Sequence, residues 1–318
     1  MEKKNNKISN GVNKYEITTK QAGERLDKFL AEEIKEITRN QLQKLIKSGQ
    51  FLVNNKEASV HYKLKDGDIV DMLEAKVDNS VLPDLASFVV GENDEYLIIN
   101  KPAGVIVHGG LGIKEKTLAD SLLKLYPEIA QVGEDEVRPG IVHRLDKEAS
   151  GLMVVAKTSK SYDNLKKQFQ NRTILKEYTA LVYGVLEKAE DKINFPIKRS
   201  SKGHKMAALP DNENIEDARE AITDFKTAKK LINFTLLNVT IKTGRTHQIR
   251  AHMAAYGHPI VGDNIYSTKK TREQNKKNDL GRVFLVASRL SFYDLAGNEQ
   301  TFTVDLPKDL ADFLATCK

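Results

Sequence analysis

Cysteine is almost absent from this chain of 318 residues, and the only one is Cys317, next to the C-terminal residue. One cysteine supports neither a disulfide framework nor a cysteine-based zinc site. Residues 1–7 are charged and polar, without the apolar region of a secretory signal. No apolar run approaches the length of a membrane-spanning helix. We therefore expect a cytoplasmic protein with no membrane contact.

The excess of one charge sign is also small. The chain has 50 Lys and Arg residues and 44 Asp and Glu residues, for a formal net charge of +6. This balance is compatible with a polyanionic partner such as nucleic acid but does not require one. With 40% hydrophobic residues, the chain is long enough for one large domain and a small one without covalent crosslinks.

Composition and periodicity divide the chain into four parts. Residues 1–13 are polar and predict a disordered tail. Residues 14–75 predict a small α/β module. Residues 76–88 lack a sustained period and include Pro83, which predicts a linker. Residues 89–318 predict one larger domain.

The small module combines two helices with short strands. Apolar residues at three- and four-residue steps predict a helix from Leu26 to Ile37. Thr38 and Gln41 form a capping-box pattern that starts a second helix, which ends at Gly49. Short strands are predicted at residues 51–53 and 66–70.

The large domain mixes strands and helices in an order too irregular for a strict βαβ repeat. We therefore expect an α+β domain built around a mixed sheet. The predicted strands are residues 96–99, 152–156, 176–182 and 234–241, and the predicted helices are residues 117–126, 162–169 and 246–256.

Residues 138–151 (RPGIVHRLDKEASG) concentrate Arg, His and Asp between a Pro-Gly turn and a Ser-Gly turn. In an extended chain, Arg144 and Asp146 share one face, and His143 and Leu145 share the other. An arginine beside a carboxylate keeps that carboxylate ionised and nucleophilic near neutral pH. The pattern indicates a catalytic Asp146 or, alternatively, an ion pair that only ties two turns together.

A second polar cluster lies where a strand ends at Gly244 and a helix begins. Arg245 lies at the predicted start of a helix, a place that suits a bound anion. A helix start that is only solvated gives the same pattern. Three nearby histidines, His247, His252 and His258, lack the spacing of a helical zinc pair. No dinucleotide fingerprint or Walker-type loop is complete in the sequence. We therefore expect no metal and no cofactor.

The second predicted helix of the small module carries a polar, basic face. Asn40, Lys44 and Lys47 are spaced to lie opposite its apolar stripe, with Arg39 adjacent. Such a face suits a phosphate backbone, and a solvated surface helix is the alternative.

Four blocks, taken together, resemble the RluA family of pseudouridine synthases, and most closely its type D, which acts on the ribosomal large subunit. The second block is the most specific. The blocks are residues 99–104 (INKPAG), 143–158 (HRLDKEASGLMVVAKT), 244–252 (GRTHQIRAH) and 257–263 (GHPIVGD).

The resemblance implies the pseudouridine synthase fold, a mixed and largely antiparallel sheet flanked by helices and loops around a central RNA-binding cleft. Residues 24–54 are similar to an S4 RNA-binding domain. That similarity favours RNA binding by Arg39, Asn40, Lys44 and Lys47. It also implies an RNA partner. We expect the protein to be a monomer.

Carried over to this sequence, the resemblance makes Asp146 the essential aspartate. Arg144 becomes the residue that fills the stack when the uridine flips out, and Tyr178 the aromatic ring that packs on the base. Arg245 becomes the cation that forms a salt bridge with Asp146.

The implied reaction breaks the N1–C1′ bond, turns the detached uracil and rejoins it through C5. Asp146 either adds to C1′ or removes a proton from C2′, and both routes stay open. We expect the substrate to be 23S ribosomal RNA in the helix 69 region. Other ribosomal or transfer RNA sites, a non-catalytic role in RNA binding or ribosome assembly, and a base-releasing glycosylase are the alternatives.

Overall fold

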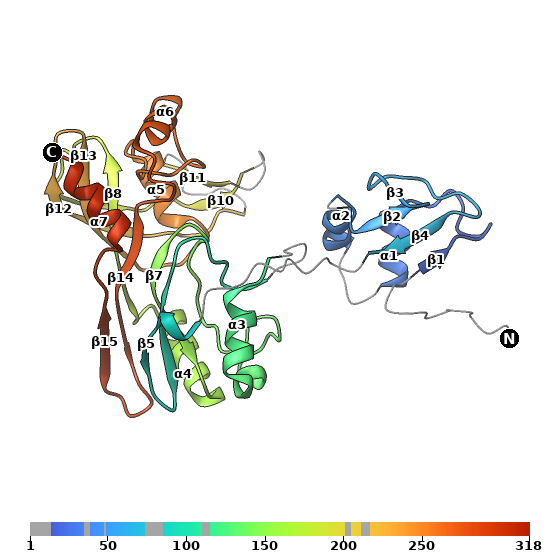
Figure 1. Cartoon of the computed structure of the whole chain (residues 1–318), viewed down its shortest axis with the longest axis horizontal. Helices are drawn as coiled ribbons and strands as arrows, with labels where there is room; N and C mark the ends of the chain where they lie inside the picture. Colours follow the sequence, from blue (N-terminus) through green and yellow to red (C-terminus); the bar gives the residue numbers. More distant parts are fainter. Residues whose placement is uncertain are drawn as a thin grey trace. The chain divides into compact units, whose positions relative to one another are not determined.

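The structure is a computed structural model that divides into two compact units, Met1–Val81 with Gly109–Lys116, and Leu82–His108 with Thr117–Lys318 (Figure 1). The predicted tail, the capping box at Thr38 and the linker up to residue 84 lie outside the described residues, so those boundaries remain predictions. The described residues are 14–34, 39–47, 49–73, 85–109, 115–200, 205–210 and 217–318, without the side chains of residues 40, 41 and 44.

The first unit packs two helices on a four-stranded antiparallel sheet of order β1-β4-β2-β3. Leu42, Leu45 and Ile46 are buried, as the apolar spacing predicted. Asn54 and Asn55 both have positive φ and make the tight turn between β2 and β3. The elements are β1 (Lys14–Glu16), α1 (Leu26–Glu33), α2 (Arg39–Lys47), β2 (Phe51–Val53), β3 (Lys56–Glu57) and β4 (Ile69–Met72).

The second unit is built on a nine-stranded sheet with helices around it (Figure 1). Its first half contains η1 (Leu85–Phe88), β5 (Val89–Glu92), β6 (Tyr96–Lys101), α3 (Leu118–Leu125), η2 (Pro127–Gln131), β7 (Ser150–Ala156), α4 (Ser159–Gln170), β8 (Leu175–Tyr183) and β9 (Glu190–Ile193). Its second half contains β10 (Ile197–Arg199), β11 (Met206–Ala208), β12 (Thr223–Lys230), β13 (Phe234–Ile241), α5 (Gln248–Ala255), α6 (Lys269–Asn278), β14 (Leu285–Tyr293), β15 (Glu299–Thr303) and α7 (Lys308–Thr316).

The sheet runs in the order β5-β6-β7-β14-β8-β13-β12-β9, and β15 pairs with β14. The pair β7–β14 is parallel and the other pairs are antiparallel. The predicted α+β class with a mixed, largely antiparallel sheet is therefore confirmed. Strand β7 is buried along its whole length, which agrees with its unbroken apolar run.

Helix boundaries follow local capping. Thr158 accepts a hydrogen bond from the Ser161 backbone, so α4 begins at Ser159, three residues before the predicted start. The helix predicted over residues 246–256 begins only at Gln248, because His247 adopts a left-handed conformation. A capping hydrogen bond thus moved the first boundary, and a left-handed backbone conformation moved the second.

Gly151 permits the parallel pairing of β7 and β14. Its φ is +113°, and an added Cβ would lie 2.3 Å from the Ala287 carbonyl oxygen and 2.5 Å from the Ala287 nitrogen. The two residues are direct partners in the parallel ladder. The sheet can close at this point only if residue 151 lacks a side chain.

We predict that Gly151→Ala destabilises the protein by on the order of 3 kcal/mol, because the new methyl group adds a backbone clash to the strain of positive φ. Gly297→Ala is the matched control: its φ is +84°, but nothing lies within 4 Å of its Cβ position. The control should lose only about 1 kcal/mol. Urea unfolding of both variants provides the measurement, and equal losses would contradict the close-approach argument.

Candidate active site

A cavity of about 470 Å³ opens between the loop before β7, strand β8 and the segment that links β13 to α5. Its lining includes Arg144, Asp146, Tyr178 and Arg245, the four residues predicted for catalysis and substrate binding in this domain. These residues come from segments that are far apart in the sequence. The fold brings them together around one cavity, and the volume of this cavity is typical of a small-molecule site.

The loop that carries Asp146 is fixed on both sides of the carboxylate. Leu145 and Ala149 are buried in the core, whereas the Asp146 side chain keeps 16% of its surface exposed. Lys101 reaches the same loop from the end of β6. It is fully buried, and its Nζ donates to the carbonyls of Pro102 (2.8 Å), Val105 (3.0 Å) and Lys147 (3.3 Å).

Burial, together with the nearby Arg282 charge, lowers the pKa of Lys101 to about 7, against the opposing effect of Asp146 and Glu148. The three carbonyls offset part of this cost by accepting all three ammonium hydrogens. Gly104 also donates its backbone N–H to the Lys147 carbonyl at 2.7 Å. The segment around residues 101–105 therefore clamps the backbone next to Asp146.

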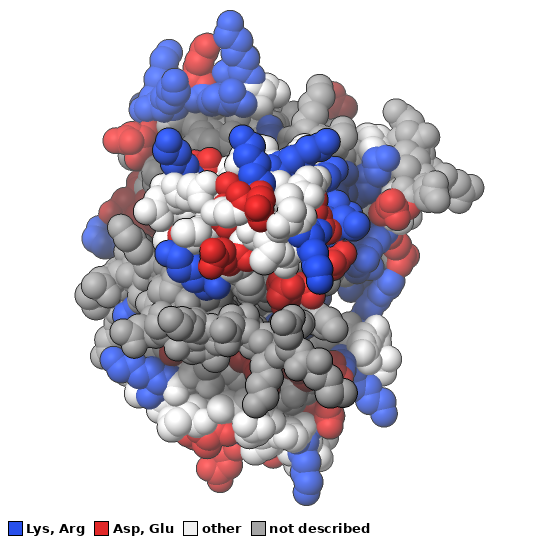
Figure 2. Space-filling model, turned by 90° about the vertical axis from the view of Figure 1, so that its right-hand side faces the viewer, with Lys and Arg blue, Asp and Glu red and all other residues white. Residues whose placement is uncertain are grey.

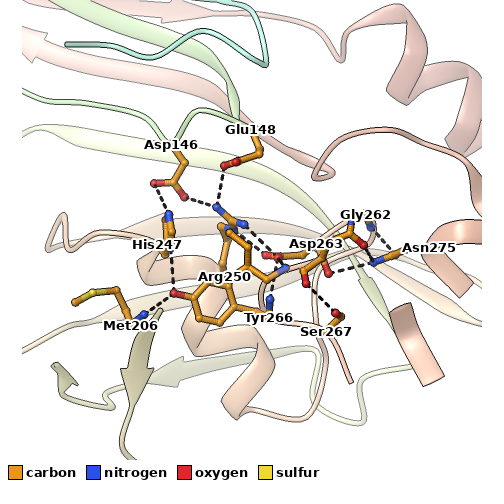
Figure 3. Close-up of polar contacts among 12 residues, drawn as sticks. Asp146, Glu148, Met206, His247, Arg250, Gly262, Asp263, Tyr266, Ser267 and Asn275 are labelled. Carbon is orange, nitrogen blue, oxygen red and sulfur yellow. Dashed lines mark hydrogen bonds and ion pairs between the residues drawn. The ribbon is translucent and has the colours of Figure 1, made fainter. Parts of the chain in front are cut away.

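The cation that pairs with Asp146 is Arg250, so the prediction of a salt bridge from Arg245 was wrong. Arg250 Nη1 lies 3.2 Å from Asp146 Oδ2 and also 3.2 Å from Glu148 Oε2 (Figure 3). Arg245 Nε instead donates to the backbone carbonyl of Glu220 at 3.1 Å. The late start of α5 places Arg250, and not Arg245, in the first turn beside the carboxylate.

Asp263 holds the Arg250 guanidinium in place. Arg250 Nε donates to Asp263 Oδ2 at 2.7 Å and Nη2 donates to Oδ1 at 3.1 Å, with both side chains almost completely buried. Burial lowers the pKa of Arg250, but the hydrogen bonds and charge of Asp263, together with Asp146 and Glu148, outweigh it and raise the pKa. The guanidinium is thus a permanent charge in a fixed orientation.

His247 faces the other oxygen of Asp146. Its Nε2 lies 4.0 Å from Asp146 Oδ1, and its Nδ1 lies 3.0 Å from the Tyr266 hydroxyl oxygen (Figure 3). Its backbone is left-handed, with φ 54° and ψ 24°, a conformation that few non-glycine residues adopt. Burial lowers the pKa of His247 despite the opposing effect of Asp146, so the imidazole is neutral at pH 7.

The contacts of Tyr266 determine which nitrogen of His247 carries the proton. The Met206 N–H donates to the Tyr266 hydroxyl oxygen at 2.8 Å, which leaves the hydroxyl hydrogen to point at His247 Nδ1. A neutral imidazole that accepts at Nδ1 carries its hydrogen on Nε2. In that tautomer the Nε2–H of His247 faces Asp146 Oδ1 from 4.0 Å, a separation longer than a direct hydrogen bond.

Gln248 fixes the turn that carries Arg245 and His247. Its side-chain oxygen accepts from the Thr243 hydroxyl (2.7 Å) and the Arg245 backbone (3.1 Å). Its side-chain nitrogen donates to the Ile222 carbonyl and the Thr223 hydroxyl. The hydrogen bonds of this buried amide thus connect the left-handed turn to residues 222 and 223 and hold the turn in place.

Tyr178 and Arg144 differ in exposure. Tyr178 lies on β8 with 7% of its surface exposed, and burial, helped by Asp146, raises its pKa so that the phenol stays neutral. Arg144 is exposed, and its Nη1 lies 3.3 Å from His108 Nε2. The structure therefore places a neutral ring inside the cavity and a solvent-facing cation at its edge.

His143 has a supporting role in the fold. Its Nε2 accepts a hydrogen bond from the Val154 N–H at 3.0 Å, and its ring stacks on Phe169. Burial, with the Lys176 charge, lowers the pKa of His143 to about 3. The ring is thus a neutral acceptor that ties the Asp146 loop to β7.

The other two histidines of the possible metal set are also tied to the fold. His252 lies between the Thr223 hydroxyl and the Phe195 carbonyl, and His258 contacts the Tyr183 carbonyl. In the described parts of the chain, no three His, Cys, Asp or Glu side chains gather as metal ligands. No helix among the described residues is long and apolar enough to cross a membrane.

The basic face predicted on α2 is only partly described. Arg39 Nη2 lies 3.0 Å from Asp27 Oδ2, and Asp27 is fully buried. Burial raises the pKa of Asp27, but bonds from Arg25, Gln43 and Arg39 outweigh it and lower the pKa. Arg39 therefore helps to hold α1 against α2, whereas Lys47 is exposed. The side chains of residues 40 and 44 lie outside the described residues.

Sequence reasoning missed Arg250, Asp263 and Tyr266. Arg250 and Asp263 both lie in the four blocks that carry the family resemblance. The choice between Arg245 and Arg250 as the partner of Asp146 depends on the exact start of α5. Tyr266 gave no sequence signal, because its neighbour Met206 is sixty residues away. Only the folded chain joins these groups.

Comparisons with known proteins identify the family of the chain. Residues 95–255 match the family model for RNA pseudouridylate synthase, and residues 24–70 match that for the S4 domain. The ribosomal large subunit pseudouridine synthase C of Vibrio vulnificus is 32% identical, with 95% of each chain covered. The corresponding synthase D of Zymomonas mobilis is 34% identical, with 92% of this chain and 94% of that protein covered.

A solved structure, human RNA pseudouridylate synthase domain containing 1, superposes with a TM-score of 0.53 at 26% identity. The match covers 69% of this chain and 82% of the human chain. The resemblance seen in the four sequence blocks is therefore confirmed in sequence and in fold. The chain belongs to the RNA pseudouridylate synthase family, and it is an RNA pseudouridine synthase that carries an S4 domain.

Proposed function

We propose that this enzyme converts specific uridines of large-subunit ribosomal RNA to pseudouridine, with Asp146 as the group that acts on the ribose. The observation that carries the proposal is the Asp146 carboxylate, held by the buried Arg250 on the wall of a cavity that also contains Tyr178. The names of the relatives of types C and D support the large subunit. The resemblance to type D directs the proposal to helix 69.

The geometry suits a flipped nucleotide. A uridine inside folded RNA must leave its stack before an enzyme reaches its glycosidic bond. Arg144 is exposed at the cavity edge, where a cation can fill the vacated stack. The buried Tyr178 ring offers a flat surface to the base.

Arg245 has a different proposed role from the one first predicted. Burial lowers its pKa, and the neighbouring Arg219 and Arg172 lower it further. Glu220 pairs with Arg172 and neutralises only part of this charge, so the group keeps an excess of positive charge that suits a phosphate beside the cavity. We assign Arg245 to the phosphate next to the target uridine.

The proposed reaction is balanced within the nucleotide. The N1–C1′ bond breaks, the C5–C1′ bond forms, C5 loses a proton and N1 gains one. Asp146 either adds to C1′ and is later displaced by C5, or removes the C2′ proton and returns it. In both routes the carboxylate must be held in a fixed orientation, and the contact with Arg250 Nη1 at 3.2 Å supports this.

A binding protein without catalysis and a base-releasing glycosylase are the other classes. The first would bind ribosomal RNA but leave its uridines unchanged. The second would release free uracil, which an isomerase retains. Incubation with ribosomal RNA followed by nucleoside analysis separates all three classes.

We predict that Asp146→Asn lowers the rate by about 10³-fold or more, because the amide cannot act as the nucleophile or base. RNA binding should survive. Release of tritium from RNA labelled at uridine C5 measures turnover, because that proton leaves during the reaction. The control is Glu148→Gln, which neutralises the other carboxylate that lies 3.2 Å from Arg250 Nη1. Full activity of Asp146→Asn would remove Asp146 from the mechanism.

We predict that Tyr266→Phe lowers the rate about tenfold at saturating RNA, because His247 loses the bond that fixes its tautomer and no longer presents its N–H to Asp146. The concentration of RNA that gives half-maximal rate should not change. Tyr256→Phe is the control, since Tyr256 is the C-cap residue of α5, at the opposite end of this helix from His247, and its hydroxyl donates to Asp191. Equal effects of the two variants would refute the positioning role.

For the S4 domain, we predict that Lys47→Ala weakens RNA binding uniformly across sequences and reduces the salt slope of binding by about 1. The turnover rate at saturating RNA should remain as in the parent protein. Lys28→Ala is the control, because Lys28 lies in the same unit and is already paired with Glu24. An unchanged binding curve for Lys47→Ala would rule out a phosphate contact at this position.

A further inference from the structure

Helix α6 concentrates positive charge outside the cavity. Over its ten residues it carries one acidic side chain, Glu273. Its five cations are all exposed, and none forms an ion pair with another described residue. Figure 2 shows Lys and Arg side chains crowded at the top of the view, the height at which α6 stands in Figure 1. The cations are Lys269, Lys270, Arg272, Lys276 and Lys277.

The charges at the two ends of the helix differ in their effect. Lys276 and Lys277 lie in the last turn, where cations complement the helix dipole, and Lys277 follows Glu273 by four residues, the favourable order. Lys269 and Lys270 occupy the first turn, where the helix dipole disfavours cations. Lys269 precedes Glu273 by four residues, the less favourable order for such a pair. Self-repulsion among five exposed cations adds to the cost. A bound polyanion would remove all three penalties.

The opposite face of α6 is fixed to the active site. Thr271 and Asn275 are its buried residues. Asn275 Oδ1 accepts hydrogen bonds from the Gly262 N–H (2.8 Å) and the Tyr183 hydroxyl (2.6 Å), and Asn275 Nδ2 donates to the Asp263 carbonyl at 3.0 Å (Figure 3). The same Asp263 orients the guanidinium that holds Asp146.

We propose that the exposed face of α6 binds the phosphate backbone of the RNA on one side of the target uridine. The proposal rests on the RNA substrate of the family and adds a second contact surface in the catalytic unit itself. Ten residues of helix extend about 15 Å, so the cations form a line, which suits a strand better than a single anion. The hydrogen bonds of Asn275 hold α6, and with it the line of cations, at a fixed position relative to the Asp146 carboxylate.

The chain offers a matched comparison for this surface. Lys226 and Lys229 on β12 are exposed lysines of the same unit and carry the same total charge as Lys276 and Lys277. Their strand lies beyond β13, toward the β9 edge of the sheet. A general loss of charge affects both pairs equally, whereas a backbone contact at α6 affects only one.

The test compares Lys276→Gln/Lys277→Gln with Lys226→Gln/Lys229→Gln. Binding of a fluorescent RNA stem-loop with unpaired uridines is measured from low to high salt. The α6 variant should bind about tenfold more weakly, and its salt slope should fall by about 2, while the β12 variant binds like the parent. Tritium release at saturating RNA should be unchanged in both. Unfolding midpoints verify that both variants are folded.

Three results would overturn the proposal. Equal weakening by both variants indicates general charge attraction. Normal RNA binding with slow turnover would mean that α6 maintains the shape of the active site and does not contact the RNA. Unchanged RNA binding together with lost binding of polyglutamate assigns the surface to an acidic protein. The binding measurement requires no uridine conversion, so its outcome is independent of whether Asp146 or the large-subunit assignment is correct.

Discussion

The buried pair of Arg250 and Asp263 is the interaction on which the active site depends. A guanidinium that is almost fully buried would be strongly unfavourable alone, and the bidentate contact with Asp263 makes its burial possible. Removing one partner of such a pair costs about 3–5 kcal/mol, because the other charge is left uncompensated. Arg250 Nη1 is then directed at Asp146, so this carboxylate is oriented by an interaction that the fold itself requires.

Asp263 also links parts that the sequence separates. Its Oδ1 accepts the backbone N–H groups of Ile265 and Tyr266, and its carbonyl accepts from Asn275. Tyr266 in turn sets the tautomer of His247, and the Arg250 guanidinium lies over the Tyr266 ring at 5.5 Å. Asp263 thus holds the Arg250 guanidinium and the backbone of Tyr266 through its carboxylate, and it holds α6 through its backbone carbonyl.

The sequence predicted the parts of the site that depend on local pattern. Asp146 and Tyr178 lie in short, specific segments, and the fold places both in one cavity. The salt-bridge partner was assigned wrongly, because the left-handed His247 delays the start of α5 and no periodicity reveals that conformation. Strand β12 was not predicted either, since its polar residues alternate weakly and its stability comes from β13 and β9.

The position of β14 has a consequence for the order in which the protein matures. This strand lies between β7 and β8, although more than a hundred residues separate it from β8 along the chain. During synthesis, β7 and β8 are made early and expose unpaired edges until β14 leaves the ribosome. Leu285, its first residue, also lines the cavity. A nascent chain that lacks β14 therefore also lacks the strand that joins β7 to β8 and one wall residue of the cavity, so the pocket forms only after residue 285 has been synthesised.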